Sequence, residues 1–170
     1  MKLSRLAISM LVAVFGMGVA TTPAQAVTAY TAHLAGANEI PARDTLARGQ
    51  AVFTLSTDGS ELRYRLVVAN IANVTAAHIH VGPANANGPV VAFLYGNVPL
   101  GGGGSNGVLA TGTITAADMV GPLTGQPLSA LLDAIESGDT YVNVHTNDGV
   151  DPTNTGAGDF PGGEIRGQIH

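Results

Sequence analysis

Short runs of alternating apolar and polar residues, separated by turn-forming residues, recur along most of this chain of 170 residues. A period of two is typical of half-buried β-strands, because successive side chains point to opposite faces of a sheet. Asp58 and Gly59 stand between the second and third runs, and this pair is typical of a tight antiparallel hairpin. Eight runs predict strands, at 28–35, 49–56, 61–70, 76–82, 89–96, 107–114, 141–146 and 163–169.

One segment has helical spacing instead of alternation. Pro127 suits a first helical turn and Gly138 suits a C-cap, which predicts a short helix between them. The apolar residues of its buried stripe are Leu128, Leu131, Leu132 and Ile135. Glycines 101–104 predict a flexible surface loop. Because no long crossover helices separate the strands, we expect an all-β fold, an antiparallel Greek-key β-sandwich or barrel of about eight strands with one short helix.

The N-terminal segment has the three parts of a secretory signal peptide. Lys2 and Arg5 precede an apolar stretch, and the small-residue pattern Ala-Gln-Ala follows at 24–26. The apolar stretch is short for a bilayer span, which disfavours the alternative of a membrane anchor. We therefore expect a signal peptide over 1–26, one domain over 27–170, and a secreted or periplasmic protein.

Charge and cysteine content exclude several classes of chemistry. The chain has no cysteine, so it has neither disulfides nor thiolate ligands. After residue 26 it has no lysine, and its five arginines face twelve acidic residues, about −7, which disfavours nucleic acid and anionic surfaces as partners. No later stretch is apolar enough to span a membrane. The sequence has neither a phosphate-binding glycine loop nor a serine nucleophile elbow.

Three histidines are candidate metal ligands. Alternation puts His78 and His80 together on one face of strand 76–82, whose other face is apolar. In the same way it puts His145 on the polar face of strand 141–146. Two imidazoles at i and i+2 can lean toward one ion, and a third from a neighbouring strand would complete the set. Neutral imidazole suits copper, zinc or nickel. The alternative is that all three are ordinary polar residues of a sheet, hydrogen-bonded to neighbours or to water.

Other residues offer weaker candidates. His33 or His170 could be a fourth ligand, but a plain strand residue and a frayed terminus are the simpler interpretations. The loop 146–160 has a composition that could bind calcium, yet it lacks the spacing of a calcium loop, so we interpret it as solvated turn chemistry. Its acidic residues are Asp148, Asp151 and Asp159.

Glu164 and Arg166 fall on the same face of the last predicted strand. We expect them to form an ion pair with a structural purpose. The sharper alternative is that Arg166 steers a small anion toward a neighbouring metal.

Five motifs follow one another along the chain and resemble the CHRD domain, named after the developmental antagonist chordin. They are LAGANEIPA (34–42), AAHIHVGPANANGPVVAFLYG (76–96), TAADM (115–119), YVNVHT (141–146) and PGGEIRGQI (161–169). This resemblance implies an extracellular or periplasmic β-rich module and gives no catalytic assignment. Because chordin binds growth factors, it also implies an alternative function without metal, adhesion to an envelope or extracellular protein or polysaccharide through sheet faces or loops.

The order of HIH, NVH and EIR is also similar to copper/zinc superoxide dismutase, a Greek-key β-barrel. That resemblance implies a copper ion held by His78, His80 and His145, Arg166 beside it as a catalytic residue, and redox or dismutase-like activity. The chain departs from the dismutase in three respects. It has no cysteine for a disulfide, no zinc-binding histidine cluster between the copper motifs, and no identified fourth copper ligand.

Overall fold

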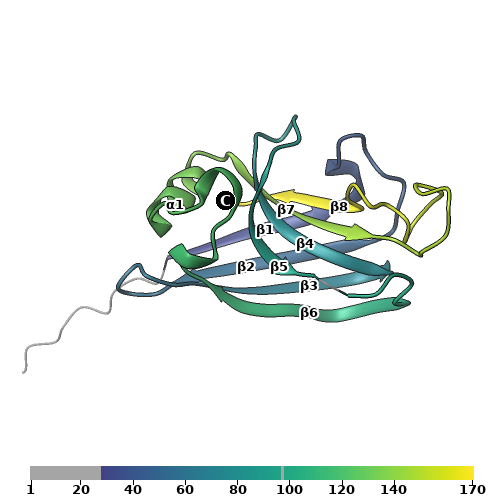
Figure 1. Cartoon of the computed structure of the whole chain (residues 1–170), viewed down its shortest axis with the longest axis horizontal. Coiled ribbons are helices and arrows are strands. Elements are labelled where there is room, and N and C mark those ends of the chain that lie inside the picture. Colours follow the sequence, from purple (N-terminus) through teal and green to yellow (C-terminus); the bar gives the residue numbers. More distant parts are fainter. Residues whose placement is uncertain (1–27, 97) are drawn as a thin grey trace, which may run out of the picture.

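The computed structural model describes residues 28–96 and 98–170, and the predicted signal peptide lies outside them. Within these ranges the chain forms eight strands and one α-helix, α1 (Leu128–Glu136) (Figure 1). The strands are β1 (Ala29–Ala35), β2 (Arg48–Leu55), β3 (Leu62–Ala72), β4 (Val74–Val81), β5 (Val90–Tyr95), β6 (Gly104–Ile114), β7 (Thr140–Thr146) and β8 (Ile165–Gln168). Three short 3-10 turns are η1 (Gly36–Asn38), η2 (Ala116–Asp118) and η3 (Gly121–Leu123).

The described strands pair antiparallel in one sheet of order β5-β4-β7-β8-β1-β2-β3-β6. The sheet curls until its ends approach each other, and the Tyr64 hydroxyl on β3 donates a hydrogen bond of 2.8 Å to the Leu94 carbonyl on β5. The result is a nearly closed barrel, which leaves little open strand edge. The predicted all-β antiparallel fold with about eight strands and one helix is confirmed.

The predicted hairpin between β2 and β3 is also confirmed. Leu55 pairs with Leu62, and the strands run antiparallel from there. Gly59 has a φ of +73°, which a side chain would disfavour. The Asp58 carboxylate accepts hydrogen bonds from the Ser60 backbone N–H and hydroxyl at 3.1 and 2.8 Å. Turn chemistry therefore sets the register of this pair.

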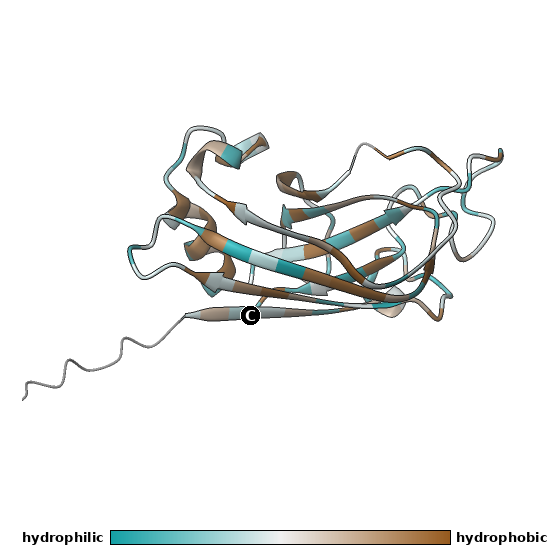
Figure 2. Ribbon diagram, turned by 90° about the horizontal axis from the view of Figure 1, so that it is seen from below, coloured by the Kyte–Doolittle hydropathy of each residue, from teal (hydrophilic) through white to brown (hydrophobic). Residues whose placement is uncertain are grey.

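The hydrophobic core lies inside the curled sheet, with α1 covering one end of it (Figure 1). Figure 2 shows hydrophobic and hydrophilic residues alternating along the strands, as expected when one face of each strand is buried. Of the predicted apolar stripe of α1, Leu128, Leu131 and Ile135 are buried. Leu132 is partly buried and packs against the edge of the core. No helix in the described ranges has the length and apolar character needed to cross a membrane.

Two predictions about irregular segments are wrong. Gly104 belongs to β6 instead of the preceding loop, because it pairs with Ala72 on the long strand β3. His170 is not frayed in its backbone, because its N–H and carbonyl bond to Thr31 at 3.0 and 2.7 Å. Backbone pairing with β1 therefore extends to the last residue.

Candidate metal centre

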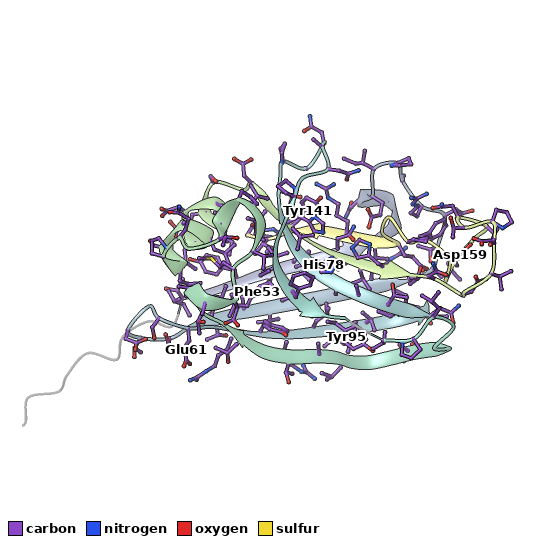
Figure 3. The ribbon with its side chains drawn as sticks, viewed as in Figure 1. Phe53, Glu61, His78, Tyr95, Tyr141 and Asp159 are labelled. Atoms are coloured by element: carbon purple, nitrogen blue, oxygen red, sulfur yellow. The ribbon has the colours of Figure 1, made fainter. Side chains whose placement is uncertain are left out.

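The pairing of β4 with β7 places the three candidate histidines on one face of the sheet. His78 lies opposite Asn143 and His80 lies opposite Tyr141, so all four share a face. Figure 3 labels His78 and Tyr141. His145 lies on the same face, two residues after Asn143. The residues between them, among them Ile79 and Val144, are fully buried in the core. The predicted alternation is confirmed.

The three imidazoles converge. One nitrogen of each ring lies within 4.8 Å of a nitrogen of the other two. His78 Nδ1 lies 3.1 Å from His145 Nε2. The ring centres are 4.8 Å apart for His78 and His145, 5.7 Å for His78 and His80, and 6.2 Å for His80 and His145. Residues 67 positions apart in the sequence are thus neighbours in one cluster.

Backbone carbonyls fix the tautomers of two of these rings. His80 Nδ1 lies 2.9 Å from the Gly88 carbonyl, and His145 Nδ1 lies 2.8 Å from the Pro161 carbonyl. Because a carbonyl only accepts, each Nδ1 carries the hydrogen and each Nε2 carries the lone pair. His80 Nε2 is buried and has no hydrogen-bond partner among the described residues. Metal-binding histidines are commonly oriented by such carbonyls.

Burial keeps the cluster uncharged. Burial, together with the proximity of His145 and His80, lowers the pKa of His78 to about 4. Burial also lowers the pKa of His80 and of His145, although their bonds to backbone carbonyls oppose this shift. All three rings are therefore neutral at pH 7, the protonation state in which imidazole binds a metal.

Connecting segments partly cover the face that carries the histidines, which the alternation alone did not predict. His80 is only 9% exposed. Three connecting segments pack over this face, and each forms a hydrogen bond with a side chain of β4 or β7. The segment after β4 supplies the Gly88 carbonyl, the segment before β8 supplies the Pro161 carbonyl, and the segment after η1 supplies Glu39.

One side of the cluster opens to a pocket of about 450 Å³, lined by Ala76, His78, Phe93, Leu94, Tyr95 and Gly96. None of these six residues is charged. Phe93 is 60% exposed, and its ring meets His78 edge-on with centres 5.0 Å apart. His78 therefore connects the cluster to an uncharged, partly aromatic opening.

Arg166 lies one strand further along the sheet, opposite Asn143 on β8. Its guanidinium packs on the ring of Tyr141, and His80 stacks on that ring with centres 4.8 Å apart and an angle of 8°. Because β7 lies between β4 and β8, Tyr141 separates Arg166 from His80. A catalytic role for Arg166 beside an ion stays a prediction.

The expected ion pair between Glu164 and Arg166 is wrong, since the described residues form no such contact. The Glu164 carboxylate instead accepts hydrogen bonds from the hydroxyls of Thr45 and Thr146 at 2.6 and 2.7 Å. It also accepts one from the backbone N–H of Gly158 at 2.9 Å. Donors of loops and of β7 therefore pair with both carboxylate oxygens, and closeness to Arg166 along the chain does not decide the partner of Glu164.

The remaining candidates lie elsewhere. His33 and His170 line a separate pocket of about 580 Å³ together with Glu39 and Arg166. Among the described residues, the three histidines form the one group of histidine and acidic side chains close enough to share an ion. The acidic residues of the loop 146–160 therefore do not converge. The Asp159 carboxylate accepts hydrogen bonds from its own loop at 2.9 and 3.0 Å, which is turn chemistry.

Sequence reasoning missed two polar residues at the edge of the cluster. Asn143 is 3% exposed and donates from Nδ2 to Glu39 Oε1 at 2.7 Å. The alternation of 141–146 puts Asn143 on the histidine face, which was a usable signal. Nothing local to Glu39 indicates that it reaches β7, since 104 residues separate the pair.

Comparison with known families agrees with the fold and the motifs. The model of the CHRD domain matches residues 30–169, nearly the whole of the described chain. The chain belongs to the CHRD domain family. The match includes α1, the three clustered histidines and all eight strands except Ala29, the first residue of β1. No curated protein and no solved structure matches the chain.

Proposed function

We propose that this CHRD domain binds one copper ion through His78, His80 and His145. The observation that supports it most strongly is the buried Nε2 of His80, an acceptor without a hydrogen-bond partner inside a cluster of three neutral imidazoles. Buried polar atoms in proteins almost always have partners, and a bound cation would provide one. The tautomers held by Gly88 and Pro161 put lone pairs on Nε2 of His80 and of His145. His145 Nε2 would exchange its hydrogen bond of 3.1 Å with His78 Nδ1 for the ion.

Copper is the metal that this donor set favours. Imidazole binds zinc, nickel and copper, and among divalent ions the affinity of such sites is highest for Cu²⁺. The chain has no cysteine, so the thiolate-bound sites of blue copper proteins are excluded. The site would therefore be of the imidazole type.

Redox exchange at this ion would take place through the pocket beside His78. The six residues that line this pocket are uncharged, and the net charge of the whole chain is −5. An uncharged pocket and a negative net charge do not attract superoxide, which is an anion. The N–H groups of Arg166 donate to protein acceptors on the far side of Tyr141, so they do not face this pocket. We therefore favour metal binding, with slow redox chemistry of small neutral molecules, over rapid superoxide dismutation.

We also propose that the protein works outside the cytoplasm. The signal-like segment 1–26 and the exclusion of nucleic acid as a partner by charge support this location. N-terminal sequencing of the protein recovered from the envelope or the culture medium should begin at Val27. Recovery of a chain that begins at Met1 inside the cell would contradict the proposal.

Equilibrium dialysis against Cu²⁺ tests the proposed site in protein purified without affinity histidines. We expect one equivalent per chain. His145→Ala should weaken the affinity by more than about 100-fold, because loss of a ligand costs more than loss of a residue that only orients one. His33→Ala is the matched control, since His33 is exposed on β1 outside the cluster, and it should leave the affinity unchanged. Equal affinities of the wild type and His145→Ala would contradict the proposal.

A second candidate function is adhesion through surface loops. Leu100 and Val150 are 56% and 63% exposed, and their loops are joined by a hydrogen bond of 3.0 Å from the Gly101 N–H to the Asn147 carbonyl. Neighbouring exposed apolar residues on loops are typical of protein contacts. Leu100→Glu with Val150→Glu should lower co-sedimentation with envelope fractions if this surface binds there, and unchanged co-sedimentation would exclude it.

A further inference from the structure

We infer that Asn143 is the fourth ligand of the bound ion, through its amide oxygen Oδ1, and that Glu39 fixes this amide in place. The inference rests on the proposed copper function. It assigns the oxygen donor of the site, which the three histidines leave undetermined.

The register of the sheet places Asn143 at the cluster. It lies directly opposite His78 on β4 and two residues before His145 on its own strand, on the same face as both. The Cβ atoms of directly opposed residues are about 5 Å apart, and those of alternate residues on one strand are about 6 to 7 Å apart. The short amide side chain therefore stands beside the imidazoles, at the level of the sheet.

The orientation of the amide is settled by Glu39. Asn143 Nδ2 donates to Glu39 Oε1 at 2.7 Å. Asn143 Oδ1 therefore points away from Glu39. This oxygen is buried and has no hydrogen-bond partner in the part of the chain that the structure describes.

Two buried acceptors without partners thus lie on the same face of β4 and β7. They are Nε2 of His80 and Oδ1 of Asn143, whose side chains sit in adjacent rows of the sheet. Leaving either acceptor unpaired in the interior is unfavourable. A single cation between them satisfies both, whereas a new hydrogen bond between two acceptors is impossible.

The loop before β8 holds the amide in this position. Gly163 has a φ of +125°, and a Cβ there would lie 2.3 Å from Asn143 Nδ2 and 2.7 Å from Glu39 Oε1. Only glycine lets the backbone approach the Asn143–Glu39 pair this closely. A ligand whose rotamer is fixed before the ion arrives is a property of built metal sites.

Electron–nuclear double resonance of the Cu²⁺ protein tests the assignment. The protein is labelled with ¹³C at the side-chain carbonyl of asparagine and receives one equivalent of Cu²⁺. We expect a ¹³C coupling in the wild type that Asn143→Leu abolishes while the histidine nitrogen couplings persist, with the affinity for Cu²⁺ weakened about tenfold. Asn85→Ala, at an exposed position, and Glu39→Gln, which keeps an acceptor for Nδ2, should retain the ¹³C coupling.

The outcomes separate this assignment from the proposed function. A signal with histidine nitrogen couplings but no ¹³C coupling overturns the role of Asn143 alone. The absence of any nitrogen-coupled Cu²⁺ signal overturns the proposed copper site and, with it, the fourth ligand. The labelled wild type decides between these outcomes even if Asn143→Leu does not fold.

Discussion

The guanidinium carbon of Arg166 lies 3.4 Å from the centre of the Tyr141 ring. The guanidinium also donates to Asn87 Oδ1 at 3.0 Å and to the carbonyls of Pro83 and Ala86 at 2.8 and 2.9 Å. These bonds tie β8 to the segment after β4, which also supplies the Gly88 carbonyl to His80. Arg166 therefore supports the histidine cluster through Tyr141 and this segment.

Arg166→Lys should destabilise the fold by about 2–4 kcal/mol, because an ammonium group cannot replace a planar guanidinium that stacks on a ring and donates in several directions. Urea unfolding followed by circular dichroism measures the loss. Arg65→Lys, at an exposed position on β3, is the control and should change stability by less than about 0.5 kcal/mol. Equal stability of the two variants would contradict the supporting role.

Glu39→Gln should change how stability depends on pH. Burial raises the pKa of Glu39 to about 7 from an ordinary value of 4.5, although Arg166 and Arg43 oppose the shift. Because the folded pKa is the higher one, the contribution of Glu39 is fully present below pH 4.5 and is lost as pH rises through 7. Wild type should therefore lose up to about 3 kcal/mol relative to Glu39→Gln between pH 4.5 and 8.

Urea unfolding of both proteins at several pH values measures that difference. The comparison cancels the titration of groups that the two proteins share. Parallel stability curves for wild type and Glu39→Gln would show that the carboxyl of Glu39 has an ordinary pKa.

Gly163→Ala should destabilise the protein by at least about 2 kcal/mol. The residue has a φ of +125°, which strains any side chain, and the added Cβ would collide with Asn143 and Glu39. Gly102→Ala is the control, because a Cβ at Gly102 meets nothing within 4 Å. Thermal unfolding that shows the same melting temperature for both variants would rule out a tight packing of this loop on Asn143.

The strand face of each histidine could be predicted because it depends on local alternation. His78, His80 and His145 alternate with apolar residues along their own strands. In any sheet with one buried face, this alternation puts the histidines on the face away from the core. That β4 and β7 are neighbours could not be predicted in this way. It depends on the order of strands in the sheet, which short alternating runs do not encode.

The cover over the histidines could not be predicted. Turn residues indicate where a loop is, but not which face it packs against. Glu39 reaches Asn143, and Pro161 reaches His145, through tertiary contacts. Arg166 shows the same limit, because it packs on Tyr141 of the next strand and not on the expected partner Glu164, two residues before it in the chain.

Continuous-wave electron paramagnetic resonance of the protein with one equivalent of Cu²⁺ tests the central claim most directly. Histidine labelled with ¹⁵N identifies imidazole ligands through the change in superhyperfine splitting. The account predicts a nitrogen-coupled signal from three imidazoles that is lost when His78, His80 and His145 are all replaced by alanine. A spectrum of unbound Cu²⁺ in the wild type, or a nitrogen-coupled signal that survives in the triple variant, would contradict it.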